Sequence, residues 1–158
     1  MSLSIQLLDV ARRRVATKIG EVTEADLRRA QSDLYYAMLH RISEGLVAAF
    51  QPDPANRASV DGWTTLYRLP EHAIVVKRCS DGRVGDFDNL IQRFANQFTS
   101  MRSKRLSADY DPTKRISISE VKQDLAAVET ALLGVDTVSP EQFSAFCFFV
   151  SLKPRRAD

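Results

Sequence analysis

A helical stripe of apolar residues between positions 27 and 46 constrains the fold of this chain most strongly. At about 100° per residue, eight apolar side chains share one broad arc of a helix: Leu27, Ala30, Leu34, Tyr35, Met38, Leu39, Ile42 and Leu46. Four polar side chains fall on the opposite side, namely Arg29, Asp33, Tyr36 and His40. This polar row is either a candidate site or an ordinary solvated face, on which an Arg29–Asp33 pair contributes about 0.2–0.5 kcal/mol.

Capping signals and further apolar repeats predict the other helices. Residues 3–19 repeat at helical spacing before Gly20, and a capping pattern at Thr23 opens a long helix to about Phe50. After a loop at 51–59, we expect helices at 59–69, 70–81, 87–109, 117 or 119 to 134, and 139–152. The β-branched run 74–76 leaves a strand as an alternative there. The expected fold is all-α, an antiparallel bundle of about six or seven helices in one domain over residues 1–158.

Composition narrows the classes of protein that this chain can represent. Its 158 residues, 44% hydrophobic and 27% charged, suffice for one compact domain. The formal charge of +2 is too small to indicate a coat of nucleic acid, although arginines cluster locally. Cys79 and Cys147 lack metal-ligand spacing, so we expect neither a metal nor a cofactor. No transmembrane run or signal sequence stands out, so we expect a soluble cytoplasmic protein with reduced thiols and no membrane association.

The helix expected at 87–109 changes from apolar to charged near its end. Continued past Met101, its apolar stripe brings Arg102, Arg105 and Asp109 onto the buried side. Arg105 and Asp109 are spaced i,i+4 and satisfy each other if the arrangement is structural. The functional alternative is an anion site in which planar guanidinium groups bind phosphate, with Tyr110 at its rim.

A second group of polar and aromatic residues surrounds Pro70. Trp63 and Tyr67 share a helix face, and Pro70 separates Arg68 from His72. A helix that begins at Pro70 has His72 in its first turn, where the helix dipole disfavours imidazolium and leaves a neutral base. A capping or packing role is the structural alternative for this histidine.

Metal-independent RNA cleavage requires a base, an acid and a cation, and histidine and arginine supply them. His40 is the only histidine besides His72. The candidate catalytic residues are therefore limited to His72 and His40, with Arg68 as a neighbouring cation.

Three segments in order along the chain resemble the HEPN superfamily: 29–40, which ends in Tyr-Tyr-Ala-Met-Leu-His, 63–68 followed by His72, and 105–112. The resemblance spans about residues 24–150. It implies an antiparallel helical bundle, usually a homodimer, of bacterial toxin–antitoxin and phage-defence systems, whose active members are metal-independent ribonucleases with the site at the dimer interface. The residues that we expect to contact RNA or a nucleotide are Arg29, Tyr36, Arg102, Arg105, Asp109 and Tyr110.

The chain departs from the HEPN pattern at two points. Active members carry an arginine, four to six residues and then a histidine, whereas three residues separate Arg68 from His72 here, and Leu106 stands where a histidine is expected. Two hypotheses follow: a defence-type ribonuclease, or a catalytically silent module that binds a nucleotide, RNA or a partner such as a nucleotidyltransferase antitoxin. His72 is the stronger catalytic candidate, because Tyr36 and His40 better suit lining or interface roles.

Overall fold

The computed structural model describes residues 1–16, 21–50 and 60–153. In these ranges it contains seven α-helices, a short 3-10 helix and no strand. The elements are α1 (Leu3–Ala16), α2 (Glu24–Ala48), α3 (Val60–Tyr67), α4 (His72–Cys79), η2 (Gly82–Asp86), α5 (Asn89–Tyr110), α6 (Ile118–Asp136) and α7 (Pro140–Ser151). The all-α expectation is confirmed for the described residues. None of the described helices is both long and apolar enough to cross a membrane.

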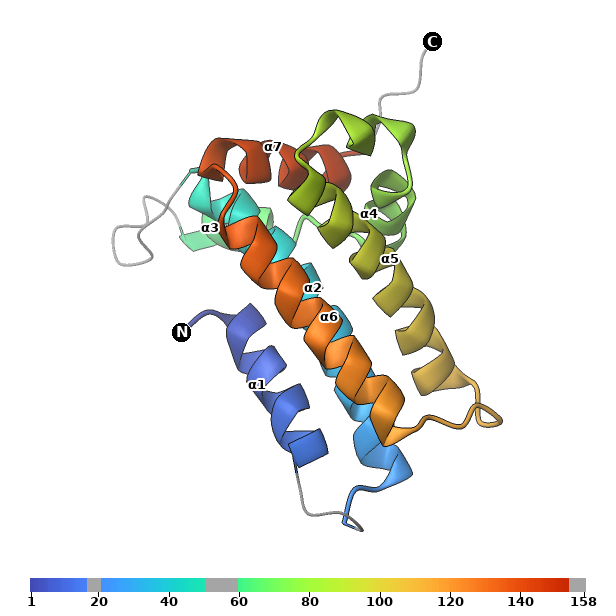
Figure 1. The fold of residues 1–158 in the computed structure, drawn as a ribbon. Coiled ribbons are helices and arrows are strands. Elements are labelled where there is room, and N and C mark those ends of the chain that lie inside the picture. Colours follow the sequence, from blue (N-terminus) through green and yellow to red (C-terminus); the bar gives the residue numbers. More distant parts are fainter. Residues whose placement is uncertain (17–20, 51–59, 154–158) are drawn as a thin grey trace.

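The helices α1, α2, α5 and α6 run alternately up and down the molecule (Figure 1). α2 contacts α1, α5, α6 and α7, and α5 packs against α6. α7 lies across the end of the bundle where α2 finishes, with α3 and α4 beside it (Figure 1). Four of the candidate residues, from α2, the start of α4 and the second half of α5, thus come close to one another: Tyr36, His72, Arg102 and Arg105.

The predicted apolar stripe of α2 is confirmed residue by residue, because all eight of its members are buried. Burial of such side chains contributes about 1.5–3 kcal/mol each. Buried residues from nearly every described helix join them in one core cluster. At Gly45 this core is especially tight: a Cβ atom there would lie 2.5 Å from Cys147 Sγ and 2.9 Å from Phe143 Cε1. Glycine therefore permits the close crossing of α2 and α7.

The capping signals located most helix starts correctly. Thr23 caps α2 in a capping box with Asp26, Ser117 caps α6, and Ser139 caps α7 with Pro140 in the first turn. α5 begins at Asn89 after its cap Asp88, slightly later than expected. α6 continues past Gly134 to Asp136 because that glycine keeps helical geometry. The expected loop at 51–59 and the expected end of the first helix at 17–20 lie outside the described residues.

The region after Pro70 differs from the expectation in detail. α4 begins at His72 with Glu71 as its N-cap, so Pro70 precedes the helix instead of occupying its first turn. The run 74–76 is helical, which excludes the strand alternative. The 3-10 helix η2, capped by Asp81, was not predicted; its five residues are too few for a periodic apolar signal.

Candidate functional site

Five side chains from α2, α4 and α5 form the polar group that we term the His72 cluster: Tyr35, Tyr36, His72, Arg102 and Arg105. The imidazole of His72 stacks on Tyr35, with ring centroids 5.6 Å apart, and meets Tyr36 edge-on at 5.8 Å. Arg102 and Arg105 both act electrostatically on His72. The structure therefore brings together four of the predicted site residues and adds Tyr35, which the sequence assigned to packing.

The hydroxyl of Tyr35 fixes the hydrogen-bonding state of His72. Tyr35 is fully buried, and its Oη lies 2.6 Å from His72 Nδ1. Burial raises the pKa of Tyr35 to about 12, so the phenol keeps its proton. Nδ1 is the one hydrogen-bond partner of that hydroxyl among the described residues, and a buried hydroxyl proton without an acceptor is costly. We therefore assign Tyr35 as the donor, Nδ1 as the acceptor and Nε2 as the protonated nitrogen.

His72 is neutral at pH 7. Burial, together with the positive charges of Arg102 and then Arg105, lowers the pKa of His72 below its ordinary value. The sequence predicted this direction from a helix dipole, whereas the causes in the structure are desolvation and two cations. Nε2 is neither fully buried nor bonded to any described residue, so its N–H group is available to an acceptor from outside.

Arg102 is the least satisfied member of the His72 cluster. Its Nε and Nη1 atoms are buried and have no hydrogen-bond partner among the described residues. No described carboxylate forms an ion pair with its guanidinium. Buried donors without acceptors typically cost about 1–3 kcal/mol each, and more when charged. Arg102 therefore has two unused N–H donors in the protein interior, and its positive charge acts on His72.

Arg105, unlike Arg102, has a carboxylate partner, although its Nε is also a buried nitrogen for which the ion pair provides no hydrogen bond. Its Nε lies 2.7 Å from Asp109 Oδ2, as the i,i+4 spacing predicted, and its Nη2 donates to Tyr36 Oη at 3.2 Å. The hydroxyl of Ser32 donates to the other Asp109 oxygen at 2.6 Å. These contacts tie the end of α5 to α2 and hold Arg105 beside the cluster.

Tyr110 is the last residue of α5 and lies beside Arg105 of the cluster. Its side chain is 70% exposed, and the Arg105 guanidinium carbon lies 5.5 Å from its ring centroid. One face of this ring thus meets a cation. The high exposure leaves the rest of the ring open to solvent.

His40 belongs to a different set of contacts. Its Nδ1 lies 2.8 Å from Tyr67 Oη, and the two rings stack at 5.6 Å. Tyr67 in turn stacks on Trp63 at 4.9 Å, so the shared helix face predicted for these two residues is confirmed. Burial lowers the pKa of His40. The two histidines thus bind different tyrosines, and no contact between them is present in the described part of the chain.

The remaining predicted arginines lie outside the His72 cluster. Arg29 and Arg68 are exposed, and neither has a contact with a histidine or a carboxylate among the described residues. The local Arg29–Asp33 pair is absent, because Asp33 instead accepts from Arg14 Nε of α1 at 2.8 Å. The polar row of α2 is therefore divided among neighbouring helices and does not line one cleft.

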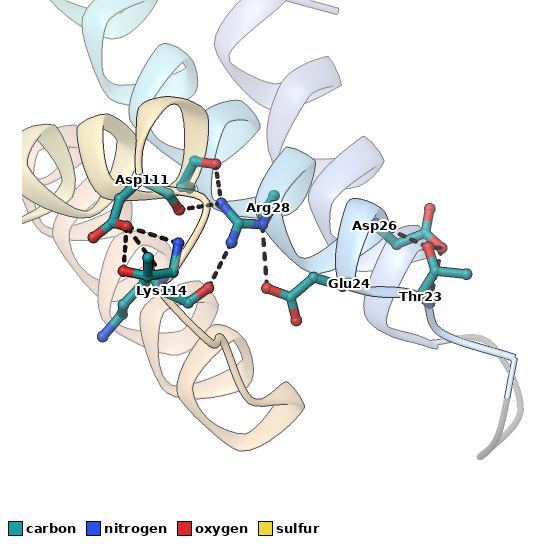
Figure 2. Close-up of polar contacts among 8 residues, drawn as sticks. Thr23, Glu24, Asp26, Arg28, Asp111 and Lys114 are labelled. Atoms are coloured by element: carbon teal, nitrogen blue, oxygen red, sulfur yellow. Dashed lines mark hydrogen bonds and ion pairs between the residues drawn. The ribbon is translucent and has the colours of Figure 1, made fainter.

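Arg28, next to Arg29, has a structural role. Its guanidinium donates to the backbone carbonyls of Ala108, at 2.7 Å, Asp111, at 3.0 Å, and Lys114, while Nε donates to Glu24 at 3.1 Å (Figure 2). Asp111 also accepts from Thr113 and Lys114 within the same loop (Figure 2). Arg28 thereby fixes the connection between α5 and α6 to α2.

Two surface hollows of about 510 and 540 Å³ lie away from the cluster, the first between α1, α2 and α6 and the second between α5 and α6. Both arginines of the first hollow are paired: Arg12 with Asp9 and Glu129, and Arg41 with Asp136. The second hollow is lined by Arg93, which is exposed, whereas the unpaired nitrogens of Arg102 are buried.

In the described ranges, no group of three or more His, Cys, Asp or Glu side chains is placed to hold a metal ion. Cys79 and Cys147 are buried free thiols. Burial raises the pKa of Cys79 to about 12 and that of Cys147 still further, so both are poor nucleophiles at neutral pH.

Sequence reasoning missed Tyr35 and Ser32 as partners of the site. Tyr35 lies on the apolar face of α2, where only its hydroxyl distinguishes it from a core phenylalanine. A buried tyrosine usually has a hydrogen-bond partner, and this signal could have marked Tyr35 for closer inspection.

No family model, no curated protein and no solved structure matches this chain.

Proposed function

We propose that this chain binds RNA through the His72 cluster, holding a phosphate group between Arg102 and the Nε2–H of His72. One observation carries the proposal: Arg102 has buried N–H groups without a protein partner, and its charge acts on a histidine that offers a further donor. Binding of a phosphate requires that the guanidinium turn towards the surface. A phosphate oxygen satisfies such donors through charge-assisted hydrogen bonds. The resemblance to HEPN proteins supports RNA as the source of that phosphate and a toxin–antitoxin or defence system as its setting.

The tautomer of His72 favours binding over cleavage. A general base must offer an unprotonated nitrogen, but Nδ1 already accepts from Tyr35 and Nε2 carries the proton. His40 has the same arrangement when Tyr67 donates to its Nδ1, because its Nε2 then carries the proton. A single copy of the chain therefore presents donors to an anion and no free base. Accordingly, we propose binding without turnover, the second of the two hypotheses drawn from the sequence.

An RNA-binding measurement with matched variants tests this proposal. Fluorescence anisotropy with a labelled single-stranded RNA, in EDTA and at low salt, gives the affinity of the wild type. Arg102→Met is expected to weaken binding about tenfold or more, because charged hydrogen bonds to phosphate are lost. Arg93→Met is the control, since Arg93 is an exposed arginine of the same helix outside the cluster. Equal affinities of the two variants contradict the proposal.

The same RNA, incubated without divalent metal and separated on a denaturing gel, tests for turnover. We expect intact RNA. Cleavage that persists in His72→Ala comes from a contaminant or another site, whereas cleavage that His72→Ala abolishes replaces binding alone with the ribonuclease hypothesis.

A further inference from the structure

Tyr110 is an exposed aromatic ring on an otherwise well-packed helix. Ile91, Phe94, Phe98 and Met101 of α5 are fully buried, whereas the Tyr110 side chain is 70% exposed. A large ring left in water forgoes the stabilisation that burial provides, roughly 1.5–3 kcal/mol for a side chain of this size. Its exposure and its position beside the His72 cluster therefore favour a role in contact with a ligand.

A continuous series of contacts connects this ring to the proposed phosphate site. The Arg105 guanidinium carbon lies 5.5 Å from the Tyr110 centroid and 5.6 Å from the Tyr36 centroid. Tyr36 in turn lies 5.8 Å from the imidazole of His72. Aromatic rings thus alternate with positive or donor groups from Tyr110 to His72. This combination is characteristic of surfaces that bind single-stranded nucleic acid by stacking bases and tracking phosphates.

The backbone on both sides of Tyr110 is held in place before any ligand arrives. Arg28 donates to the carbonyl of Ala108, two residues before the ring, and to that of Asp111, the residue after it (Figure 2). The side chain of Asp109 is fixed as well, by Ser32 and Arg105. Because the end of the helix does not need to be ordered on binding, the ring offers its surface at a small entropic cost.

We propose that the ligand is single-stranded RNA, with one base stacked on the open face of Tyr110 while a nearby phosphate lies against Arg102 and His72. This inference rests on the proposed function and adds the strandedness of the ligand. Stacking on Tyr110 requires a base that has left its own stack, which a single strand supplies readily and an A-form duplex does not. The Arg105 guanidinium carbon, 5.5 Å from the ring centroid, adds a cation–π contact.

Three ligands of equal length and label test the inference: a single-stranded oligoadenylate, an abasic ribose-phosphate oligomer, and an RNA duplex. Tyr110→Ala is expected to weaken the oligoadenylate complex about tenfold, as for the loss of one stacked base, and to leave the affinity for the abasic oligomer nearly unchanged. Tyr110→Phe keeps the ring and is expected to restore most of the lost affinity. Phe50→Ala, which removes an exposed ring remote from the cluster, serves as the control.

Each result has a distinct meaning. Wild-type binding to the oligoadenylate that is at least about tenfold tighter than to the duplex supports the inference. Equal effects of Tyr110→Ala on oligoadenylate and abasic oligomer, or equal affinities for duplex and single strand, overturn it. If these occur while Arg102→Met still weakens binding, only the stacking inference fails. If the wild type binds none of the three ligands, the proposed function itself fails.

Discussion

Arg28 and Arg102 are two arginines of the same bundle with opposite surroundings. Arg28 donates to three backbone carbonyls and one carboxylate (Figure 2). Arg102 has two buried nitrogens that donate to no described residue. The difference separates a guanidinium whose donors are satisfied within the fold from one with two donors that no described residue satisfies. It predicts that stability and RNA affinity depend on different arginines.

The largest effect on stability is expected from Arg28→Ala. The variant loses several charge-assisted hydrogen bonds and leaves the carbonyls of the α5–α6 connection without their donor, which lowers the free energy of unfolding by about 3 kcal/mol. Urea denaturation measures the change. Arg29→Ala, at the exposed neighbouring position, is the control and is expected to stay within about 0.5 kcal/mol of the wild type. Equal stabilities of the two variants would show that the contacts of Arg28 with the α5–α6 connection do not stabilise the fold.

A smaller loss of stability is expected from Tyr35→Phe. Removing the hydroxyl deprives His72 Nδ1 of its donor and lowers the free energy of unfolding by about 1 kcal/mol. In the wild type, the imidazole ¹⁵N chemical shifts of His72 are expected to identify the Nε2–H tautomer, and in the variant this preference weakens. An Nδ1–H tautomer in the wild type contradicts the donor assignment and returns His72 to the role of a candidate base.

Arg102→Met is expected to leave the free energy of unfolding unchanged or to raise it by up to about 1 kcal/mol, because it removes buried donors that have no protein partner. The same urea experiment serves for comparison with Arg28→Ala. A loss of stability as large as that of Arg28→Ala is the contradictory outcome. It would show that Arg102 has a structural partner and that the two arginines do not differ in this respect.

The smallest expected effect concerns pH. The pKa values of His40 and His72 are lowered from the ordinary value of 6.5. At pH values between 6.5 and the lower pKa values of the folded protein, these histidines bind more protons in the unfolded chain than in the folded chain. The free energy of unfolding is therefore highest above pH 6.5 and declines as the pH falls through the folded-state values.

Urea denaturation between pH 8 and pH 5 measures this decline. The single variants His40→Gln and His72→Gln are each expected to flatten part of it. In Arg102→Met, the pKa of His72 moves back towards 6.5 without reaching it, because burial, the largest cause of the shift, remains. A stability that rises on acidification over this interval contradicts the assignment of two neutral histidines.

Local sequence determined much of the fold because helix formation depends on short spacings. The apolar stripe of α2 predicted its buried face, and the caps at Thr23 and Ser139 were located from a few adjacent residues. Even the pairing of Arg105 with Asp109 was predictable, since i,i+4 neighbours lie on one helix face. Arg102 has no carboxylate at such a spacing, with Phe98 and Leu106 at i−4 and i+4.

Only the tertiary structure decided which polar groups share a site. Arg28 reaches carbonyls about 80 residues away, Asp33 pairs with α1, and Tyr35 meets a histidine from a helix that begins 37 residues later. These partners depend on how the helices dock, which is set by the whole core and not by any local spacing. The sequence alone therefore determined the helices, their buried faces and the candidate residues. The docking of α2, α4 and α5 decided that Arg28 is satisfied while Arg102 is not.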